Sequence, residues 1–247
     1  VKAFDPGKLT DARAKWAAAG REQSKLFTVF RYFFQDYPFD HVMSFAEHKD
    51  YWRGIFKRFA DPTYFEKHAV NVSAVESLNE HTDTRMVTDK ALLAPHLLTE
   101  QAAVSVWNGE YRGVILPTDC RLVIVNGPEG NDIPVEFFKL AIESDNILGY
   151  HPYSLWINKQ RQQGDWPFIS GRWHFMEREY GLKPVWAFTE SGPFYDSGKG
   201  WRADNCLAGD ETLLVRAMRD WVRDVAQTPA YREGRIMGPG AWFTSGG

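Results

Sequence analysis

Two patterns of hydrophobic and polar positions take turns along the chain. Short runs rich in β-branched and aromatic residues predict strands, and longer stretches with apolar residues three or four positions apart predict helices. The runs that predict strands are residues 1–5, 25–34, 69–78, 121–126, 147–153, 183–189 and 240–244. The stretches that predict helices are residues 10–23, 49–67, 88–108, 133–144, 169–181 and 210–226.

This alternation predicts an α/β protein with parallel strands, because a helix between two strands returns the chain to the same edge of the sheet. The 247 residues suit one TIM-type (β/α)8 barrel, which takes about 250 residues. The chain opens on a strand and closes just after one, so we expect a single domain over residues 1–247, truncated by the first strand and the last helix of the barrel. An open doubly wound sheet is the alternative, but the sequence carries no glycine-rich dinucleotide or phosphate motif to support it.

Two of the predicted strands end on a carboxylate. The segment Val-Glu-Ser-Leu-Asn-Glu ends at Glu80, and the segment Val-Trp-Ala-Phe-Thr-Glu ends at Glu190. The carboxyl ends of parallel barrel strands share one rim, where such enzymes hold their catalytic groups. Two carboxylates on that rim suit cleavage of a glycosidic bond, in which one protonates the leaving oxygen and the other attacks the anomeric carbon from about 5–5.5 Å away.

These motifs resemble those of the clan A glycoside hydrolases, a large superfamily of retaining (β/α)8-barrel enzymes. In that clan an Asn-Glu pair ends the fourth strand, and its Glu is the acid/base; a Glu at the end of the seventh strand is the nucleophile. The resemblance implies Asn79 and Glu80 for the first motif and Glu190 for the second. It further implies that Asn79 donates to the 2-hydroxyl of the sugar. The likeness covers nearly the whole chain by pattern and does not single out one family of the clan.

The resemblance extends to four further residues. The sixth strand of the clan often ends in a His and a Tyr near the nucleophile, which implies His151 and Tyr153 here. The eighth often offers a Trp as a sugar platform, which implies Trp242. The arginine that usually stands on an early strand, often the second, has its candidate in Arg31 on the third, a departure from the pattern. We expect His151 to orient Glu190 or a sugar hydroxyl, and Tyr153 or Arg31 to keep Glu190 ionised; a purely structural role is the alternative for His151, Tyr153 and Trp242.

Composition narrows the choice of partners. Aromatic residues make up 15% of the chain, enough to build a large core and to line a site that stacks on sugar rings. The net charge of -3 offers no basic footprint for nucleic acid. No apolar run of about 18 residues predicts a membrane span, and no signal peptide is visible. We expect a soluble protein, and leave open whether it is secreted by a leader that lies outside this chain.

The sequence therefore predicts a retaining β-glycosidase that acts on an oligo- or polysaccharide without a cofactor. The histidines show no HExxH or paired spacing, so no metal site is expected. Cys120 falls at the start of a strand and Cys206 in a loop at the other end, so no disulfide between them is expected. Three alternatives remain: a non-catalytic carbohydrate- or cell-wall-binding barrel, an inverting hydrolase with carboxyl groups about 6.5–9.5 Å apart, and an unrelated α/β barrel in which the two glutamates are coincidental.

Overall fold

The computed structural model describes residues 14–15, 17–20, 29–30, 42–59, 73–128, 131–152, 173–189, 222–223 and 225–239. Within these residues the chain forms one sheet of six parallel strands. The strands are β1 (Val29–Phe30), β2 (Ala74–Glu76), β3 (Arg121–Gly127), β4 (Ile147–Tyr150), β5 (Val185–Phe188) and β6 (Ile236–Pro239).

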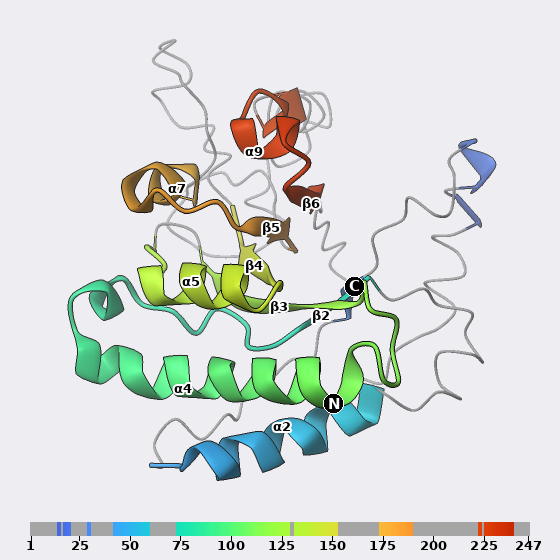
Figure 1. Ribbon diagram of the computed structural model, residues 1–247. Coiled ribbons are helices and arrows are strands. Elements are labelled where there is room, and N and C mark those ends of the chain that lie inside the picture. The colour runs from blue at the N-terminus through green and yellow to red at the C-terminus, as the bar shows by residue number, and fades with distance from the viewer. Residues whose placement is uncertain are drawn as a thin grey trace, which may run out of the picture.

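Each strand pairs with the next strand along the chain, so that the order in space is β1-β2-β3-β4-β5-β6 (Figure 1). Parallel neighbours need a crossover between them, and such crossovers are right-handed in nearly all proteins. A doubly wound sheet reverses its strand order part-way, and the six described strands show no reversal. This confirms the predicted α/β class with a parallel sheet, whereas closure of eight strands into a barrel stays a prediction.

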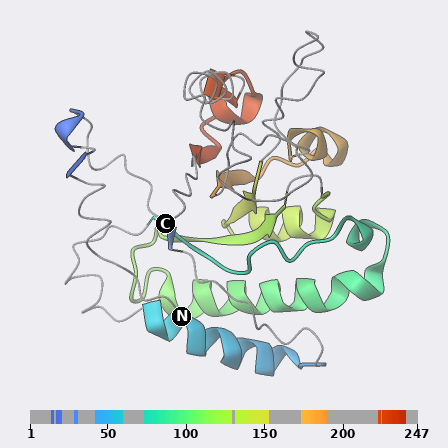
Figure 2. The ribbon, with the colours of Figure 1, turned by 180° about the vertical axis from the view of Figure 1, so that it is seen from behind.

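Helices pack on the sheet in layers. The longer ones are α2 (Phe45–Phe59), α4 (Lys90–Val106), α5 (Val135–Glu143) and α7 (Trp173–Tyr180); the short elements are the 3-10 turn η2 (Thr84–Val87), the π-helical turn η3 (Trp107–Tyr111) and α9 (Pro229–Arg232). Helix α4 lies between α2 and the strands, as both views show (Figures 1 and 2). The indole nitrogen of Trp52 on α2 donates to the carbonyl of Thr99 on α4 at 3.0 Å, so the two helices are joined by a buried hydrogen bond as well as by apolar packing.

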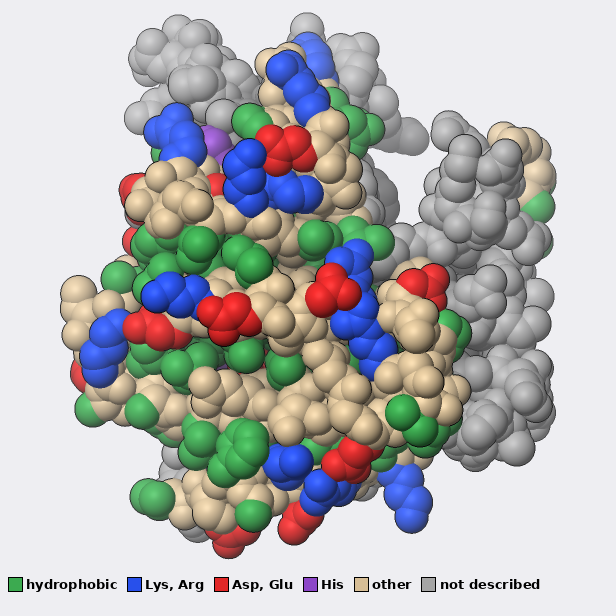
Figure 3. All heavy atoms as spheres, in the orientation of Figure 1, with side chains coloured by type: hydrophobic (Ala, Val, Ile, Leu, Met, Phe, Trp, Pro, Cys, Tyr) green, Lys and Arg blue, Asp and Glu red, His purple; other side chains and the backbone are tan. Residues whose placement is uncertain are grey.

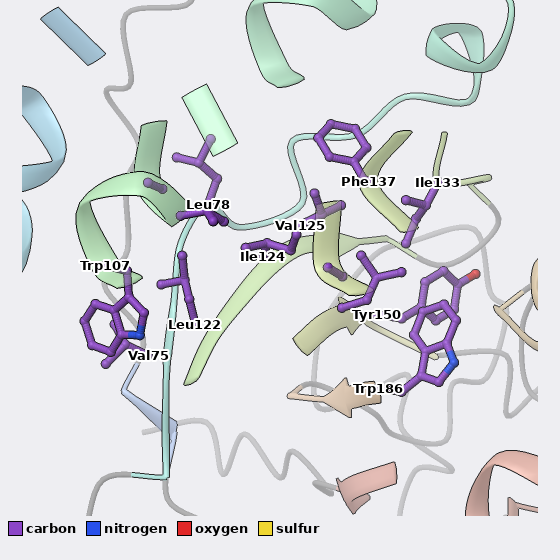
Figure 4. Close-up of a cluster of buried hydrophobic side chains, with 14 of the residues drawn as sticks. Val75, Leu78, Trp107, Leu122, Ile124, Val125, Ile133, Phe137, Tyr150 and Trp186 are labelled. Atoms are coloured by element: carbon purple, nitrogen blue, oxygen red, sulfur yellow. The ribbon is translucent and has the colours of Figure 1, made fainter. Parts of the chain in front are cut away.

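The two faces of the sheet carry different side chains, because successive residues of a strand point to opposite sides. The face toward the helices carries large apolar residues that join the main core, among them Val75, Leu122, Ile124, Leu148 and Trp186 (Figure 4). The other face carries a second, smaller cluster of Ala74, Val123, Ile147 and Ala187. The polar residues of the candidate site belong to this second face, at the carboxyl ends of the strands.

Most of the predicted elements that fall on described residues are confirmed. Strands overlap the predicted ranges 25–34, 69–78, 121–126, 147–153 and 183–189, and helices overlap 49–67, 88–108, 133–144 and 169–181. Gly181 follows α7 with φ +65°, a left-handed conformation that ends helices and that glycine adopts readily. The last strand differs, because β6 lies at 236–239, where no strand was predicted. The predicted strands at 1–5 and 240–244 lie outside the described residues.

The described surface mixes charges of both signs (Figure 3). Lys90 pairs with Glu136 and Arg112 with Asp145, each at 2.6 Å. Exposed pairs of this kind contribute little to stability, about 0–1 kcal/mol each. Among the described residues, no helix has the length and apolar character needed to cross a membrane.

Candidate active site

Three segments of the sheet's carboxyl edge meet around His151, which directly follows β4. Its backbone amide donates to the carbonyl of Gly127 at the end of β3, at 2.8 Å. Nδ1 of the ring lies 2.7 Å from Oε1 of Glu80, and Nε2 lies 3.2 Å from Oγ1 of Thr189. The His151 side chain is fully buried, whereas the Glu80 side chain keeps 32% of its surface exposed. A buried imidazole thus connects the segments after β2 and β5, and the carboxyl group that it contacts remains accessible to a ligand.

Asn126 extends this network to the backbone. The hydroxyl of Thr189 donates to Oδ1 of Asn126 at 3.2 Å, and Nδ2 of Asn126 donates to the carbonyl of Leu78 at 3.4 Å. Asn126 also pairs with Asn79 across the sheet edge. The hydrogen-bonded series therefore runs from Glu80 through His151, Thr189 and Asn126 back to the segment that carries Glu80.

The hydrogen bonds of Asn126 and Thr189 favour a tautomer of His151 in which Nε2 carries a proton. The carbonyl of Leu78 requires a donor, so the amide nitrogen of Asn126 faces it and Oδ1 faces Thr189. The Thr189 hydroxyl gives its proton to Oδ1, so its oxygen accepts from Nε2–H of His151. Nδ1 then either accepts a proton from Glu80 or donates one to it. Nδ1 and Oε1 of Glu80 thus face each other across 2.7 Å, a distance over which the two groups can share a proton.

A β-bulge in β3 turns Asn126 toward the site. The pairing with β4 runs from Ile124 opposite Leu148 to Asn126 opposite Gly149 and skips Val125. Ile124 and Val125 consequently both join the helix-side core (Figure 4). The next side chain, Asn126, faces the opposite side, where it contacts Thr189. Val125 has φ +52°, a region that a β-branched residue adopts only under strain.

Gly149 provides the space that Asn126 occupies. A Cβ atom at residue 149 would lie 2.0 Å from Oδ1 of Asn126 and 2.8 Å from the carbonyl oxygen of Val125. Real Cβ contacts are never this short, so any larger residue would displace the amide group. The sequence motif Gly-Tyr-His at the end of β4 therefore supplies both the imidazole and the room for its network.

Glu80 itself sits on a strained backbone. Its φ of +47° is in the left-handed region, which costs a residue with a Cβ about 1–2 kcal/mol. Such strain persists only where the surroundings impose it, and it concentrates at functional sites. The contact with His151 and the pairing of Asn79 with Asn126 are the surroundings that hold this conformation.

The predicted site residues divide into two groups. Asn79, Glu80 and His151 are described, and the structure brings them together at one edge of the sheet. His151 contacts Glu80, whereas the sequence predicted that it orients Glu190 or a sugar hydroxyl. The residues Arg31, Tyr153, Glu190 and Trp242 lie outside the described residues. Sequence reasoning missed Asn126 and Thr189, although each is a polar residue at the end of a predicted strand, which is the signal that would have found them.

A second polar cluster lies behind the site, between α4 and the sheet. Oε1 of the fully buried Glu100 accepts from the hydroxyl of Ser77 at 2.7 Å and from the amide of Val125 at 3.1 Å. Nε2 of His81 lies 3.5 Å from the same oxygen, and the His81 ring stacks on His96 with centroids 5.4 Å apart. This cluster touches the segments that precede Glu80 and Asn126 and uses none of the residues predicted from the sequence.

Burial controls the charge of this cluster. It raises the pKa of Glu100 to about 8, and hydrogen bonds from Ser77 and Val125 lower it by less. Burial, reinforced by the neighbouring His96, lowers the pKa of His81 to about 3. Both groups are therefore uncharged at neutral pH, because a low-dielectric interior disfavours the ionised form of each.

Cys120 and possible metal ligands add nothing to the site. Cys120 is buried and free at the start of β3, as the sequence predicts for its position, and burial raises the pKa of its thiol to about 12. Cys206 lies outside the described residues. In the described part of the chain, no three His, Cys, Asp or Glu side chains group in a way that could hold a metal ion.

No protein-family model matches the sequence, and a search of curated proteins gave no significant match.

Proposed function

We propose that this protein hydrolyses β-glycosidic bonds of an oligo- or polysaccharide with retention, using Glu80 as acid/base and Glu190 as nucleophile. One observation carries the proposal: Nδ1 of the buried His151 lies 2.7 Å from Oε1 of Glu80, whose carboxyl group stays accessible. General acid catalysis requires a proton within reach of the leaving oxygen. The pair gives it up when the glycosidic bond breaks and recovers it from the water that completes hydrolysis.

The position of Glu190 in the chain supports the second role. Thr189, whose hydroxyl lies 3.2 Å from His151, is the residue that directly precedes Glu190. The ends of β2 and β5, which the sequence equates with the fourth and seventh strands of a barrel, are thus connected through one histidine. Retaining enzymes require their two carboxyl groups about 5–5.5 Å apart, so that one protonates while the other attacks.

The strand order supports the barrel itself. Six parallel strands follow one another in space as they do in sequence, which is the order of strands in a (β/α)8 barrel. The helix side carries the large core, and the other side carries the small residues and the polar strand ends. In a closed barrel this second face is the interior, and its carboxyl end is where the active site of such enzymes lies.

The substrate contacts in this proposal follow the resemblance to the clan. Asn79 lies beside Glu80 and is held by its pairing with Asn126. In the proposed role its side-chain amide donates to the 2-hydroxyl of the sugar, a contact that strengthens in the transition state. Tyr153, Arg31 and Trp242 remain proposed contacts of the nucleophile and the sugar ring.

The test is hydrolysis of a panel of aryl β-glycosides and β-glucans by the wild type, Glu80→Ala and Glu190→Ala, with and without azide. We expect both variants to lose activity by several orders of magnitude. Without the nucleophile, azide attacks the substrate once and gives a glycosyl azide of inverted configuration. Without the acid/base, azide attacks the glycosyl-enzyme after a first inversion and gives the retained configuration.

The stereochemistry separates the alternatives. An inverted sugar product from the wild type refutes the retaining mechanism in favour of an inverting one. A wild type that binds β-glucans but cleaves none of the panel refutes hydrolysis and favours the carbohydrate-binding alternative. Full activity of Glu80→Ala refutes the acid/base role of Glu80 and with it the proposal.

A further inference from the structure

Glu100 is a buried carboxyl group at the edge of the site, with hydrogen bonds from Ser77 and from the backbone of Val125 and Leu78. It lies on α4, fully shielded from solvent, and faces the carboxyl ends of β2 and β3. Ser77 and Val125 both donate to the same oxygen, Oε1, at 2.7 and 3.1 Å. Desolvating a carboxyl group is costly even when it is neutral, and an apolar side chain would fill this helix–sheet interface without that cost. A role beyond packing is therefore indicated.

The partners of Glu100 are the residues that set the geometry of the candidate site. Val125 is the bulge residue that the pairing between β3 and β4 skips, so its amide is absent from that part of the ladder. The carboxyl oxygen supplies the missing acceptor and holds Val125 at φ +52°. Because the bulge decides which face Asn126 takes, Glu100 acts on the network that fixes His151.

Ser77 connects Glu100 to the other half of the site. It immediately follows β2 and stands three positions before Glu80. Its amide donates to Val123 at 2.9 Å and its hydroxyl to Glu100 at 2.7 Å, so backbone and side chain both anchor the start of the turn that leads to Glu80. One carboxyl oxygen thus ties together the two segments that carry the acid and the network behind it.

We propose that Glu100 is a positioning residue, which holds the bulge at Val125 and the end of β2 so that Asn126 and Glu80 stand in reacting geometry. The inference rests on the proposed glycosidase function for its kinetic consequence, and on the contacts of Oε1 for its structural content. Glu100 itself touches no substrate, because it lies on the helix side of the sheet.

The neutral state of the carboxyl group makes the proposal testable by a conservative change. Burial raises the pKa of Glu100 to about 8, so at pH 7 the group presents a carbonyl oxygen to Ser77 and Val125. The amide of glutamine presents the same oxygen in the same place, whereas leucine fills the volume with no acceptor. Glu100→Gln should therefore preserve the geometry that Glu100→Leu removes.

The experiment compares four variants at pH 7: Glu100→Gln, Glu100→Leu, Ser77→Ala and Thr99→Val. Thr99 is the matched control, because it is the neighbouring buried residue of α4 and its hydroxyl contacts Trp52 on the side away from the sheet. We expect Glu100→Leu to lower kcat about 100-fold with KM nearly unchanged, since small displacements of reacting groups cost about that much. Ser77→Ala should lower kcat by about 3- to 10-fold, because one lost hydrogen bond is worth about 1 kcal/mol. Glu100→Gln and Thr99→Val should stay within about twofold of the wild-type kcat, because the first keeps the acceptor oxygen and the second leaves the contacts of Glu100 in place.

Amide hydrogen exchange provides a readout that needs no turnover. Glu100→Leu should speed exchange at Val125, Asn126 and Leu78 at least about tenfold relative to Thr99→Val, because the acceptor that closes the bulge is gone. Glu100→Gln should leave these amides protected. If the wild type hydrolyses no glycoside, the proposed function fails while the exchange data still decide the positioning role.

Two results would overturn the inference. One is unchanged exchange at these amides in Glu100→Leu. The other is a Ser77→Ala variant whose kcat equals that of Thr99→Val; this comparison decides the question even where Glu100→Leu does not fold.

Discussion

Replacing Gly149 with alanine tests the closest contact in the site. The added Cβ would lie 2.0 Å from Oδ1 and 2.8 Å from Cγ of Asn126, and 2.8 Å from the backbone oxygen of Val125. Rotation of the Asn126 side chain would relieve the first two contacts at the expense of its hydrogen bonds to Thr189 and Leu78. The third contact is with backbone, so β3 and β4 would also have to move apart.

The magnitude follows from these two adjustments. Overpacking of a closed interior costs about 1–3 kcal/mol. Leaving a buried amide without its partners costs about 1–3 kcal/mol more. We expect Gly149→Ala to lower the free energy of unfolding by about 2–6 kcal/mol, and to lower kcat about 100-fold because His151 loses the support of Thr189 and Asn126.

The assay is urea denaturation followed by tryptophan fluorescence, with kinetics on an aryl glycoside in parallel. Gly54→Ala is the matched control, since nothing lies within 4 Å of its added Cβ and the residue is in the exposed part of α2. Alanine there should raise the stability by about 0.5–1 kcal/mol, because it is the better helix former. The double variant Asn126→Ala/Gly149→Ala should be more stable than the sum of the single changes predicts, because the contacts with the amide disappear and only the one with the Val125 backbone remains. Wild-type stability of Gly149→Ala would refute the placement of Asn126 and with it the network around His151.

Three further predictions concern the buried groups. Burial raises the pKa of Glu100 from 4.5 to about 8, so the folded chain holds a proton that the unfolded chain releases, and the free energy of unfolding falls as the pH rises from 4.5 to 8. Burial lowers the pKa of His81 from 6.5 to about 3, so the free energy of unfolding also falls as the pH drops from 6.5 toward 3. Chemical denaturation across pH should therefore show that this pair stabilises the fold most near pH ~5.5. Glu100→Gln should abolish the fall of the free energy of unfolding on the alkaline side. A fall of the same size in that variant contradicts the assignment. The His151→Phe variant should keep its fold but lose about 100-fold in kcat on aryl glycosides, and a kcat near that of the wild type would show that the proton beside Glu80 needs no histidine. The thiol of Cys120, with its pKa raised to about 12, should resist iodoacetamide at pH 8 in the folded protein and react after unfolding, as mass spectrometry of the peptide would show.

The fold was accessible to sequence reasoning where local signals and burial agree. The run Arg-Leu-Val-Ile-Val-Asn predicts β3 because β-branched residues favour a buried strand, and the strand forms there. In contrast, β6 ends in Gly-Pro, a pair typical of turns, so the strand was hidden and the prediction moved to the aromatic residues that follow. Strand length and ring closure depend on pairing with distant segments, which no local window contains.

The candidate site was predicted in part for the same reason. A carboxylate at a strand end is a visible signal, and it led to Glu80; the imidazole of His151 came from the resemblance. The bulge at Val125 cannot be predicted from the local sequence. The side of the sheet that Asn126 faces depends on the register of β3 with β4 and on a hydrogen-bond acceptor 25 residues away on α4. Glu100 likewise resembles any helical glutamate in sequence, and its burial is decided by α2 and the sheet that enclose α4.

The neighbour-by-neighbour strand order also governs how the protein is assembled during synthesis. A strand that emerges from the ribosome finds its partner already made, because β3 docks on β2, β4 on β3 and β5 on β4. Each pairing joins a strand to the one made just before it, which favours sequential assembly from the N-terminus. His151 can meet Glu80 as soon as β4 is in place, whereas its second nitrogen finds Thr189 only after β5 has been translated. A nascent chain released between these two strands would hold the contact of His151 with Glu80 but not the one with Thr189, so the proposed site is completed late in translation, after most of the sheet has formed.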